Sequence, residues 1–272
     1  MAIGALVTGG SSGIGAEVAR VLAQAGYHLV LSHFEDDENA DQVRHAIIDQ
    51  YGVRCSVFAG NLADASVPSQ LAEYALQELG TVSVLVNNAG VTRMASVEEF
   101  QLGMIDHVFG LNFRAPLLLA RDIGNHMIHR GVSGVIINIA STRAFRAYPR
   151  DSIYGGLKSA LVRATESMAL DLARYDIRVN CIAPGAIQVR QRASLDTFYQ
   201  RLGHRIPLGR VGQPDDVARA VRWLVSEEAA YVTGTTIRVD GGLILPGMPE
   251  RLPEGTEDYG WGVVRDAPKS ET

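Results

Sequence analysis

The 272-residue sequence contains only two cysteines, Cys55 and Cys181. Two thiols in a chain of this length do not form a disulfide framework, and no closely spaced cysteine pair indicates a metal site. Each cysteine lies in an apolar, strand-like stretch, so we expect two small buried hydrophobic side chains. We therefore expect a reducing, cytoplasmic location and no bound metal.

Long hydrophobic runs and an excess of positive charge are also missing. No apolar stretch approaches the roughly 18 residues that span a bilayer, and residues 1–8 lack the basic stretch of a secretory signal peptide. The 25 Lys and Arg residues against 30 Asp and Glu give a formal net charge of −5, whereas nucleic-acid-binding proteins are usually basic. We expect neither a membrane nor a nucleic-acid partner.

Hydrophobic residues make up 47% of the chain and charged residues 20%, which excludes a disordered chain. Short runs rich in Val, Ile and Leu alternate with stretches of helical period, and such runs suit parallel strands buried on both faces. We predict a single Rossmann-type α/β domain, a doubly wound parallel sheet of about seven strands with helices on both faces. The expected strands are 2–7, 28–32, 54–58, 82–86, 135–139, 178–182 and 235–239, and the expected helices include 14–25, 40–51, 67–79, 113–130 and 157–175.

The composition changes after Leu245. Residues 246–272 contain four prolines, four glycines and many charges without a clear period. We expect residues 1–245 to form the dinucleotide-binding and catalytic domain and residues 246–272 to form a C-terminal tail. Such a tail is either partly disordered or docked on a partner subunit through Tyr259 and Trp261.

A glycine-rich segment, TGGSSGIG at residues 8–15, joins the first expected strand to the first expected helix. Glycines lack a Cβ, so backbone N–H groups can approach a pyrophosphate, and the helix N-terminus adds positive potential. The spacing departs from the common G-x-G-x-x-G fingerprint, and the next residues, Ala16 and Glu17, exclude a Walker A loop. A plain strand-to-helix turn is the alternative. The expected cofactor contacts here are Gly9, Ser11, Ser12, Gly13, Ile14 and Gly15.

Tyr154 and Lys158 are four residues apart in a stretch of helical pattern, which puts both on one helix face. A nearby ammonium favours the phenolate form, so such a tyrosine can pass a proton to or from a hydroxyl or carbonyl oxygen. Ser141 follows the strand expected at 135–139, and ligands of open α/β sheets bind beyond the carboxyl ends of the strands. Singly, each residue also fits a solvated surface; together with the glycine-rich segment they indicate an active site.

These features resemble the short-chain dehydrogenase/reductase family. The matching motifs follow the family's order from residue 2 to about residue 245. Within the family, the general sequence pattern, including residues 229–234, is most similar to glucose 1-dehydrogenase-like sugar and polyol dehydrogenases. The motifs are the segment 8–15, Asn87-Asn88-Ala89-Gly90, Asn112, Ser141, Tyr154-x-x-x-Lys158, Pro184-Gly185 and Val239-Asp240-Gly241-Gly242.

The resemblance implies an NAD(P)-dependent oxidoreductase that transfers a hydride between a nicotinamide and a secondary alcohol or ketone. It implies that Tyr154 is the general acid/base, that Lys158 holds the nicotinamide ribose and that Ser141 orients the substrate oxygen. It also implies that Asn112 holds a water where a long helix bends; from the residue alone, a helix cap before Phe113 is the alternative. Further implied cofactor contacts are Asn61, Leu62, Asn88, Ala89, Gly90, Pro184, Gly185 and Ile187.

One departure from the family pattern concerns the choice of cofactor. His33 stands where members that prefer NAD usually have an aspartate. A protonated histidine can contact a 2′-phosphate, whereas Glu35 can repel it or accept a hydrogen bond from a free 2′-OH. This favours NADP slightly over NAD and leaves dual use open.

Two further departures concern single contacts with the dinucleotide. Asn61 replaces the usual aspartate, and its amide can still meet the adenine edge. Val189 replaces a threonine that bonds the nicotinamide amide in the family. The backbone of Ile187 or the side chain of Gln188 can substitute for that contact.

Six arginines occur in the segments that face the substrate in this family. They allow two interpretations: a positive entrance that grips an anionic substrate, such as a hydroxy or keto acid or a sugar phosphate, or solvated side chains. The side chains of Tyr148, Asp151 and Ser152 are candidate partners for the hydroxyls of a polyol. We expect residues 188–207 to form either a mobile lid or a rigid surface element. The arginines are Arg93, Arg143, Arg146, Arg150, Arg190 and Arg192.

Two alternatives to a dehydrogenase remain, an epimerase or dehydratase with bound nicotinamide and a non-catalytic dinucleotide sensor. The long helices expected at 113–130 and 157–175 should carry apolar faces too wide for one domain. Because the family builds dimers and tetramers on the corresponding helices, the resemblance implies a homotetramer acting on a small-molecule substrate.

Overall fold

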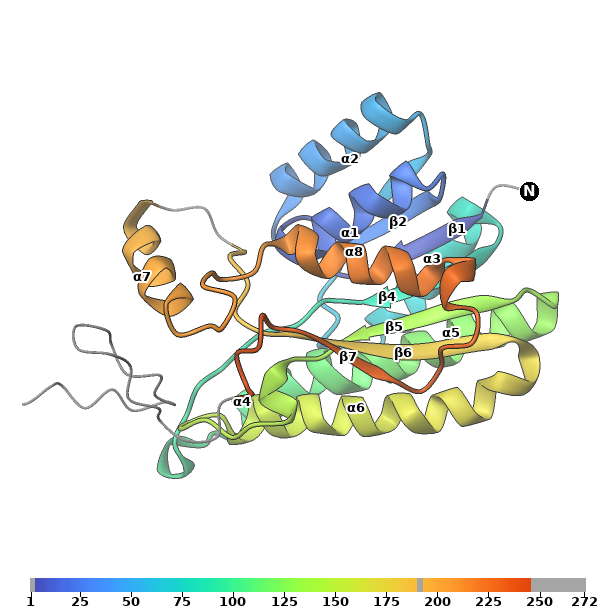
Figure 1. Cartoon of the computed structure of the whole chain (residues 1–272). Helices are drawn as coiled ribbons and strands as arrows, with labels where there is room; N and C mark the ends of the chain where they lie inside the picture. Colours follow the sequence, from blue (N-terminus) through green and yellow to red (C-terminus); the bar gives the residue numbers. More distant parts are fainter. Residues whose placement is uncertain (1–2, 190–192, 246–272) are drawn as a thin grey trace, which may run out of the picture.

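The centre of the fold is a parallel sheet with strand order β3-β2-β1-β4-β5-β6-β7 (Figure 1). The computed structural model describes residues 3–189 and 193–245. Strand β1 pairs with β2 on one side and β4 on the other, which confirms the predicted Rossmann-type α/β fold. The strands are β1 (Gly4–Val7), β2 (His28–His33), β3 (Cys55–Ala59), β4 (Val82–Asn87), β5 (Gly134–Ile139), β6 (Ile177–Pro184) and β7 (Thr236–Val239).

The central strands are apolar at successive positions because both faces of the sheet are covered. Every residue of β1, β4 and β5 is buried. In register, Leu6 pairs with Val30 of β2 and Leu85 of β4. The buried side chains divide between two hydrophobic cores, one on each face, which explains why these strands read as continuous hydrophobic runs.

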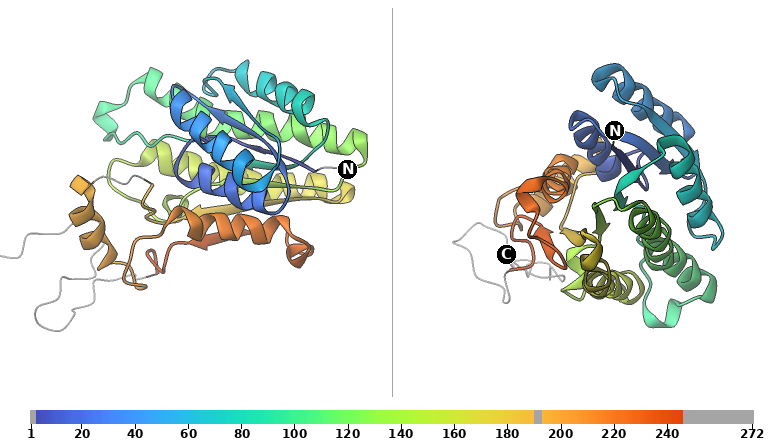
Figure 2. Two further views of the ribbon diagram at one scale, coloured as in Figure 1. Left: turned by 90° about the horizontal axis from the view of Figure 1, so that it is seen from above. Right: turned by 90° about the vertical axis from the view of Figure 1, so that its right-hand side faces the viewer.

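Helices cover both faces of the sheet (Figures 1 and 2). The core on one face takes its helical side chains from α1, α2 and α8, and the core on the other face takes them from α3, α5 and α6. The bounds are α1 (Gly13–Gln24), α2 (Asp37–Tyr51), α3 (Val67–Leu79), α5 (Ala115–Arg130), α6 (Ser152–Leu172) and α8 (Pro214–Val225).

The helix expected at 113–130 has a different start. Helix α4 (Leu102–Phe109) continues through a π-helical turn, Gly110–Arg114, into α5. Asn112 therefore lies inside a continuous helical stretch, and the alternative of a helix cap before Phe113 is wrong. Asn112 is fully buried. Such π turns inside α-helices occur frequently at functional sites.

The helix expected at 157–175 also begins earlier. Helix α6 starts at Ser152, so Tyr154 lies in its first turn, and a short 3-10 turn, η4 (Ala173–Tyr175), follows its end. Another 3-10 turn, η3 (Thr142–Ala144), links β5 to the segment before α6. The segment 188–207 includes helix α7 (Ala193–Gly203), which lies beside the sheet's carboxyl end (Figure 1).

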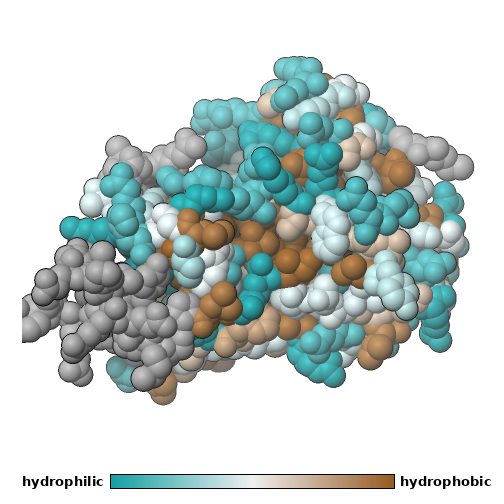
Figure 3. Space-filling model, viewed as in Figure 1, coloured by the Kyte–Doolittle hydropathy of each residue, from teal (hydrophilic) through white to brown (hydrophobic). Residues whose placement is uncertain are grey.

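Strand β7 is the last strand of the sheet and leaves one edge open. Figure 3 shows hydrophobic surface over the middle of this view, between α8 and α6, where β7 runs in Figure 1. Ile237 and Val239 of β7 are only partly buried against the core. An open edge with apolar side chains is a usual place for a partner to add.

Both cysteines of the chain are buried free thiols, as expected. Burial raises the pKa of Cys55 to about 12 and the pKa of Cys181 to about 11. Residues 3–189 and 193–245 contain no helix able to cross a membrane and no cluster of three or more potential metal ligands.

Candidate active site

The predicted site residues gather at one edge of the sheet. The glycine-rich segment follows β1, residues 87–90 end and follow β4, Ser141 follows β5, and Gly185 follows β6. These four strands are neighbours and all run parallel, so their carboxyl ends form a common edge. In sheets of this kind, ligands bind at that edge.

The glycine-rich segment has the shape of a cradle that side chains would fill. Gly9 and Gly13 adopt φ angles of +64° and +54°, which favour glycine. A Cβ on Gly15 would lie 2.0 Å from the Gly9 carbonyl oxygen and 2.6 Å from Asn88 Nδ2. The close approach therefore requires glycine, and the start of α1 lies open to a pyrophosphate. These residues fit a bound dinucleotide.

The cradle is tied to the end of β4 by a hydrogen-bond network. Thr8 Oγ1 accepts from the backbone N–H groups of Asn88 and Ala89, both at 2.9 Å. Asn88 Nδ2 donates to the carbonyl oxygens of Thr8 and Gly9, at 2.9 and 3.1 Å. The side chain of Asn88 thus holds the loop in place, a role for which a short amide is well suited because it has donors of fixed direction.

Asn112 braces the segment that follows β4. Its Oδ1 accepts from Val91 N and its Nδ2 donates to Val91 O, both at 2.9 Å. A Cβ on Gly90 would lie 3.2 Å from Asn112 Oδ1 and 3.5 Å from Lys158 Nζ. The amide of Asn112 and the ammonium of Lys158 therefore face the same glycine.

Ser141, Tyr154 and Lys158 come together between β5 and α6. Lys158 is buried, and its Nζ donates to Ile139 O at 2.7 Å and lies 5.7 Å from the centroid of the Tyr154 ring. Ser141 is two residues beyond Ile139, and its Oγ accepts from Arg143 N at 3.2 Å. Lys158 thus links the end of β5 to the helix that carries Tyr154. Ser141 and Tyr154 are both partly exposed.

His33 does not have the environment expected of a cofactor contact. It ends β2, but its side chain is only 3% exposed, and Nε2 lies 3.9 Å from Asp37 Oδ1. The Nδ1 atom is buried without a hydrogen-bond partner among the described residues. The imidazole therefore offers little surface to a 2′-phosphate, and the four residues 35–38 that follow are all acidic.

The other predicted cofactor contacts divide into exposed and buried groups. Asn61 is partly exposed, with Oδ1 accepting from Ala63 N at 3.0 Å, whereas Leu62 is buried in the core. Pro184 ends β6. A Cβ on Gly185 would lie 2.7 Å from Asp240 Cβ, so this glycine lets the loops after β6 and β7 approach.

Residues 187–189 run beside the glycine-rich cradle. Ile187 forms a parallel bridge with Gly212, and Gln188 N donates to Gly212 O at 2.8 Å. Gln213 Nε2 donates to Gln188 Oε1 at 3.1 Å. A Cβ on Gly13 would lie 3.2 Å from Val189 Cβ, so Val189 contacts the cradle. The part played by Gly212 and Gln213 was not predicted, because no motif marks them.

Two of the six arginines are neutralised by nearby carboxylates. Arg143 Nη1 lies 3.1 Å from Asp151 Oδ1, and Arg150 Nη2 lies 2.8 Å from Glu99 Oε2. The side chain of Asp151 is only 2% exposed, so the idea that it bonds a substrate hydroxyl is wrong. Arg93 is exposed and Arg146 partly exposed, whereas Arg190 and Arg192 lie outside the described residues.

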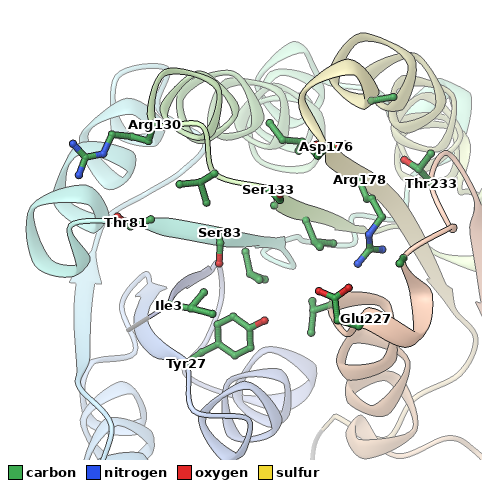
Figure 4. Close-up of a pocket in the computed structure, with 18 of the residues that line it drawn as sticks. Ile3, Tyr27, Thr81, Ser83, Arg130, Ser133, Asp176, Arg178, Glu227 and Thr233 are labelled. Carbon is green, nitrogen blue, oxygen red and sulfur yellow. The ribbon is translucent and has the colours of Figure 1, made fainter. Parts of the chain in front are cut away.

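A hollow of about 1140 Å³ lies at the opposite, amino-terminal end of the sheet (Figure 4). Tyr27, Arg178 and Glu227 line it, together with Ser83 of β4. Burial, and then Glu227, raise the pKa of Tyr27, while burial lowers the pKa of Arg178. None of the predicted site residues lines this hollow.

Comparison with known proteins identifies the class. Residues 9–244 match the family model described as enoyl-(acyl carrier protein) reductase. The chain belongs to the short-chain dehydrogenase/reductase family, and it is an NAD(P)-dependent oxidoreductase acting on CH–OH groups and the corresponding ketones.

The match with individual relatives extends over nearly all of each relative's length. The chain is 34% identical to glucose 1-dehydrogenase 2 of Bacillus subtilis over 244 residues, 89% of this chain and 94% of the relative. The structure of acetoin dehydrogenase YohF from Salmonella typhimurium has a TM-score of 0.84 at 35% identity, with coverage of 90% and 97%. A blue fluorescent protein from a metagenomic library, in complex with NADPH, has a TM-score of 0.83 at 31% identity, with coverage of 89% and 97%.

Proposed function

We propose that the carboxyl-end cluster reduces a ketone, or oxidises the matching secondary alcohol, with Tyr154 as the general acid/base. The observation that carries this proposal is the meeting of Tyr154, Lys158 and Ser141 beside the glycine-rich cradle. A non-catalytic dinucleotide sensor needs the cradle but has no use for a phenol, an ammonium and a hydroxyl held together.

The proposed chemistry divides between the cofactor and the chain. The nicotinamide supplies or accepts the hydride when bound. In the direction of reduction, the Ser141 hydroxyl orients the carbonyl oxygen, and the Tyr154 phenol donates a proton to it. The Lys158 ammonium lies 5.7 Å from the centroid of the Tyr154 ring, so its positive charge lies near the negative charge that develops on the phenol. Asn112 braces residues 90–91 beside Lys158 and holds the water of a proton relay.

The proposed dinucleotide contacts begin at the glycine-rich cradle and continue along the carboxyl ends of the neighbouring strands. Gly9, Gly13 and Gly15 allow backbone N–H groups near a pyrophosphate, with Ser11, Ser12 and Ile14 beside them. Asn61, Leu62, Asn88 and Ala89 border the adenosine half. Gly90, Pro184, Gly185 and Ile187 border the nicotinamide half.

We propose a small neutral substrate, a diol or hydroxyketone, over a hydroxy or keto acid. Two arginines near the site already pair with carboxylates, Arg143 with Asp151 and Arg150 with Glu99. A guanidinium that is neutralised in this way attracts an anion less strongly. Structural similarity to acetoin dehydrogenase, named for a hydroxyketone, agrees with this choice.

We also propose that the chain uses both NAD and NADP. The relative solved with NADPH supports NADP, whereas the acidic residues 35–38 repel a 2′-phosphate and support NAD. The buried His33 side chain removes the basis of the slight preference for NADP. With both cofactors, kcat/KM should agree within about tenfold, and Glu35→Gln should raise the value for NADP only. A strict preference for one cofactor contradicts dual use.

The deciding experiment follows absorbance of the reduced nicotinamide over a panel of diols, hydroxyketones, sugars and hydroxy acids. We expect turnover of the neutral compounds, and Tyr154→Phe should lower kcat by at least about 100-fold without changing cofactor Kd. Full turnover in Tyr154→Phe contradicts the mechanism. Binding of cofactor with no turnover of any compound favours the sensor.

We propose a homotetramer as the working assembly. The open edge at β7 carries partly exposed apolar side chains, and α6 carries Leu170, which is 80% exposed. Such surfaces are costly to leave in water. Light scattering at micromolar concentration should give four times the 29.3 kDa chain mass. A monomeric mass contradicts this assembly.

A further inference from the structure

An ion pair between a partly buried arginine and a buried carboxylate joins the two elements that carry the proposed acid–base residues. Arg143 lies in η3, two residues after Ser141, and Asp151 directly precedes α6, which carries Tyr154. Arg143 Nη1 lies 3.1 Å from Asp151 Oδ1. The pair therefore connects the turn that holds Ser141 to the first turn of the helix that holds Tyr154.

Arg143 is held on several sides. Its backbone N–H donates to Ser141 Oγ at 3.2 Å. Its Nη1 donates to Met94 Sδ at 3.3 Å, and its guanidinium carbon lies 4.8 Å from the centroid of the Tyr148 ring. The backbone of the residue that pairs with Asp151 thus also holds the Ser141 oxygen, which accepts from Arg143 N and keeps its own proton to donate.

Asp151 depends on Arg143 for charge compensation. The groups that oppose the effect of burial on this carboxylate are the Arg143 guanidinium and the backbone N–H of Gly155. A Cβ on Gly155 would lie 2.9 Å from Asp151 Oδ2 and 3.1 Å from Arg143 O, so the glycine lets α6 pack closely on the pair. A buried carboxylate is costly unless a cation offsets it.

The titration of Asp151 reflects these surroundings. Burial raises the pKa of Asp151, and the Arg143 guanidinium opposes that rise. The ionisable groups that face it are Arg143 from η3 and the Tyr148 phenol from the segment before α6. Asp151 therefore takes up a proton at a higher pH than the ordinary carboxyl value of about 4.

A second ion pair nearby provides a contrast. Arg150 and Glu99 approach to 2.8 Å, but their side chains are 53% and 46% exposed. Exposed pairs contribute only about 0–1 kcal/mol because water screens them. Breaking this pair tests the loss of a salt bridge in the same region without removing a buried charge.

We propose that Arg143 and Asp151 are positioning residues that set the Ser141 hydroxyl against the Tyr154 phenol, and that they act only while Asp151 is charged. This inference depends on the proposed function, because it requires Ser141 and Tyr154 to act on one oxygen. Protonation of Asp151 breaks the pair, so turnover declines on the acid side of the pH profile. Arg143 then serves alignment and not the binding of an anionic substrate.

The first test is Asp151→Asn, which keeps the volume and removes the charge. We expect kcat to fall by about tenfold to 100-fold, since a misplacement of about 1 Å can cost that much. KM for the cofactor should stay the same, and the acid limb of the wild-type kcat profile should disappear. Glu99→Gln, the matched control, should change kcat by less than twofold. An unchanged kcat and acid limb in a folded Asp151→Asn protein overturns the proposal.

The second test uses a double-mutant cycle. Arg143→Met alone leaves a buried uncompensated carboxylate, whereas Arg143→Met with Asp151→Asn leaves none. The double variant should therefore recover thermal stability over either single variant, and Arg143→Lys should keep more activity than Arg143→Met. Additive losses of stability in the cycle contradict a coupled pair. If Arg143→Met alone does not fold, a double variant that also fails to fold contradicts it.

Substrate choice separates alignment from anion binding. Alignment predicts that Arg143→Met lowers kcat by the same factor for neutral and acidic substrates. A rise in KM for acidic substrates alone overturns the positioning role. Failure of the proposed function looks different, because Tyr154→Phe would then keep its turnover. Failure of this inference alone leaves Tyr154→Phe impaired and Asp151→Asn at the wild-type rate.

Discussion

The two ends of the sheet differ in what their polar side chains do. At the carboxyl end, Asn88, Asn112 and Lys158 each bond to backbone atoms of a neighbouring loop or strand end. At the amino end, Tyr27, Arg178 and Glu227 line a hollow of about 1140 Å³ (Figure 4). Arg178 bonds the carbonyl oxygens of Val232 and Ser226 at the longer distances of 3.3 and 3.4 Å.

This difference shows that neither the size of a hollow nor a shifted pKa is sufficient to identify the active site. Burial raises the pKa of Tyr27 at the amino end, and perturbed pKa values often mark functional sites. Among the described residues at that end, however, no glycine-rich cradle lies beside the tyrosine. Tyr154 has both the glycine-rich cradle and a buried ammonium nearby. Substitutions at the two ends should therefore have different effects on catalysis.

The largest effect is expected from Gly15→Ala. A Cβ there would lie 2.0 Å from Gly9 O, so the cradle must open. We expect cofactor Kd to rise by at least about 100-fold, because the backbone N–H groups lose their shared direction. Gly103→Ala is the control, since a Cβ there would meet no atom within 4 Å beyond its own helical turn. Equal Kd values for the two variants contradict the cradle.

A smaller effect is expected from Asn112→Ala. The change removes both hydrogen bonds to Val91 and leaves partly buried backbone groups without these partners, at a cost of about 1–3 kcal/mol in unfolding free energy. Because residues 90–91 lie beside Lys158, kcat should also fall by about tenfold or more. Denaturant melts and initial rates measure the two effects. A loss of stability without a loss of kcat restricts Asn112 to a structural role.

At the amino end, Tyr27→Phe should change only alkaline stability. The folded-state pKa of Tyr27 is raised by burial, so its contribution is complete below the unfolded value near 10 and is lost as pH rises through the folded value. Melting temperature against pH should therefore decline less steeply above about pH 10 in the variant. A change in kcat/KM at neutral pH contradicts the division between the two ends.

The smallest effect is expected from thiol reagents. Cys55 and Cys181 are buried, and their pKa values are raised to about 12 and about 11. Native protein at pH 8 should therefore take up almost no thiol reagent, whereas unfolded protein should take up two equivalents. Rapid labelling without loss of fold shows that one of the strands β3 and β6 opens.

Much of the fold follows from patterns that are local in the sequence. Parallel strands buried on both faces are apolar throughout, so their places could be predicted, and Tyr154 and Lys158 share a helix face by spacing alone. Helix α8 was not among the predicted helices, although Pro214 at its start and buried Val217 and Val221 are local signals for it.

The remaining features depend on contacts that are distant in sequence. The buried position of His33 is set by packing at the end of β2, and a count of residues from the glycine-rich segment cannot reveal it. The pair of Arg143 and Asp151 forms because the first turn of α6 lies against η3. Residues 87–90 matched a motif, but the bond from Asn112 to Val91 depends on the π turn between α4 and α5. The resemblance implied a bend at Asn112, whereas the residue alone suggested a helix cap.

The most direct measurement is the rate of hydride transfer in the first turnover, followed by stopped-flow absorbance of the reduced nicotinamide. Wild type, Tyr154→Phe and Tyr27→Phe should be compared at saturating cofactor with a hydroxyketone or diol from the panel. We expect the hydride-transfer rate to fall by at least about 100-fold in Tyr154→Phe and to stay at the wild-type value in Tyr27→Phe. Equal rates in Tyr154→Phe and wild type would contradict an active site at the carboxyl end of the sheet.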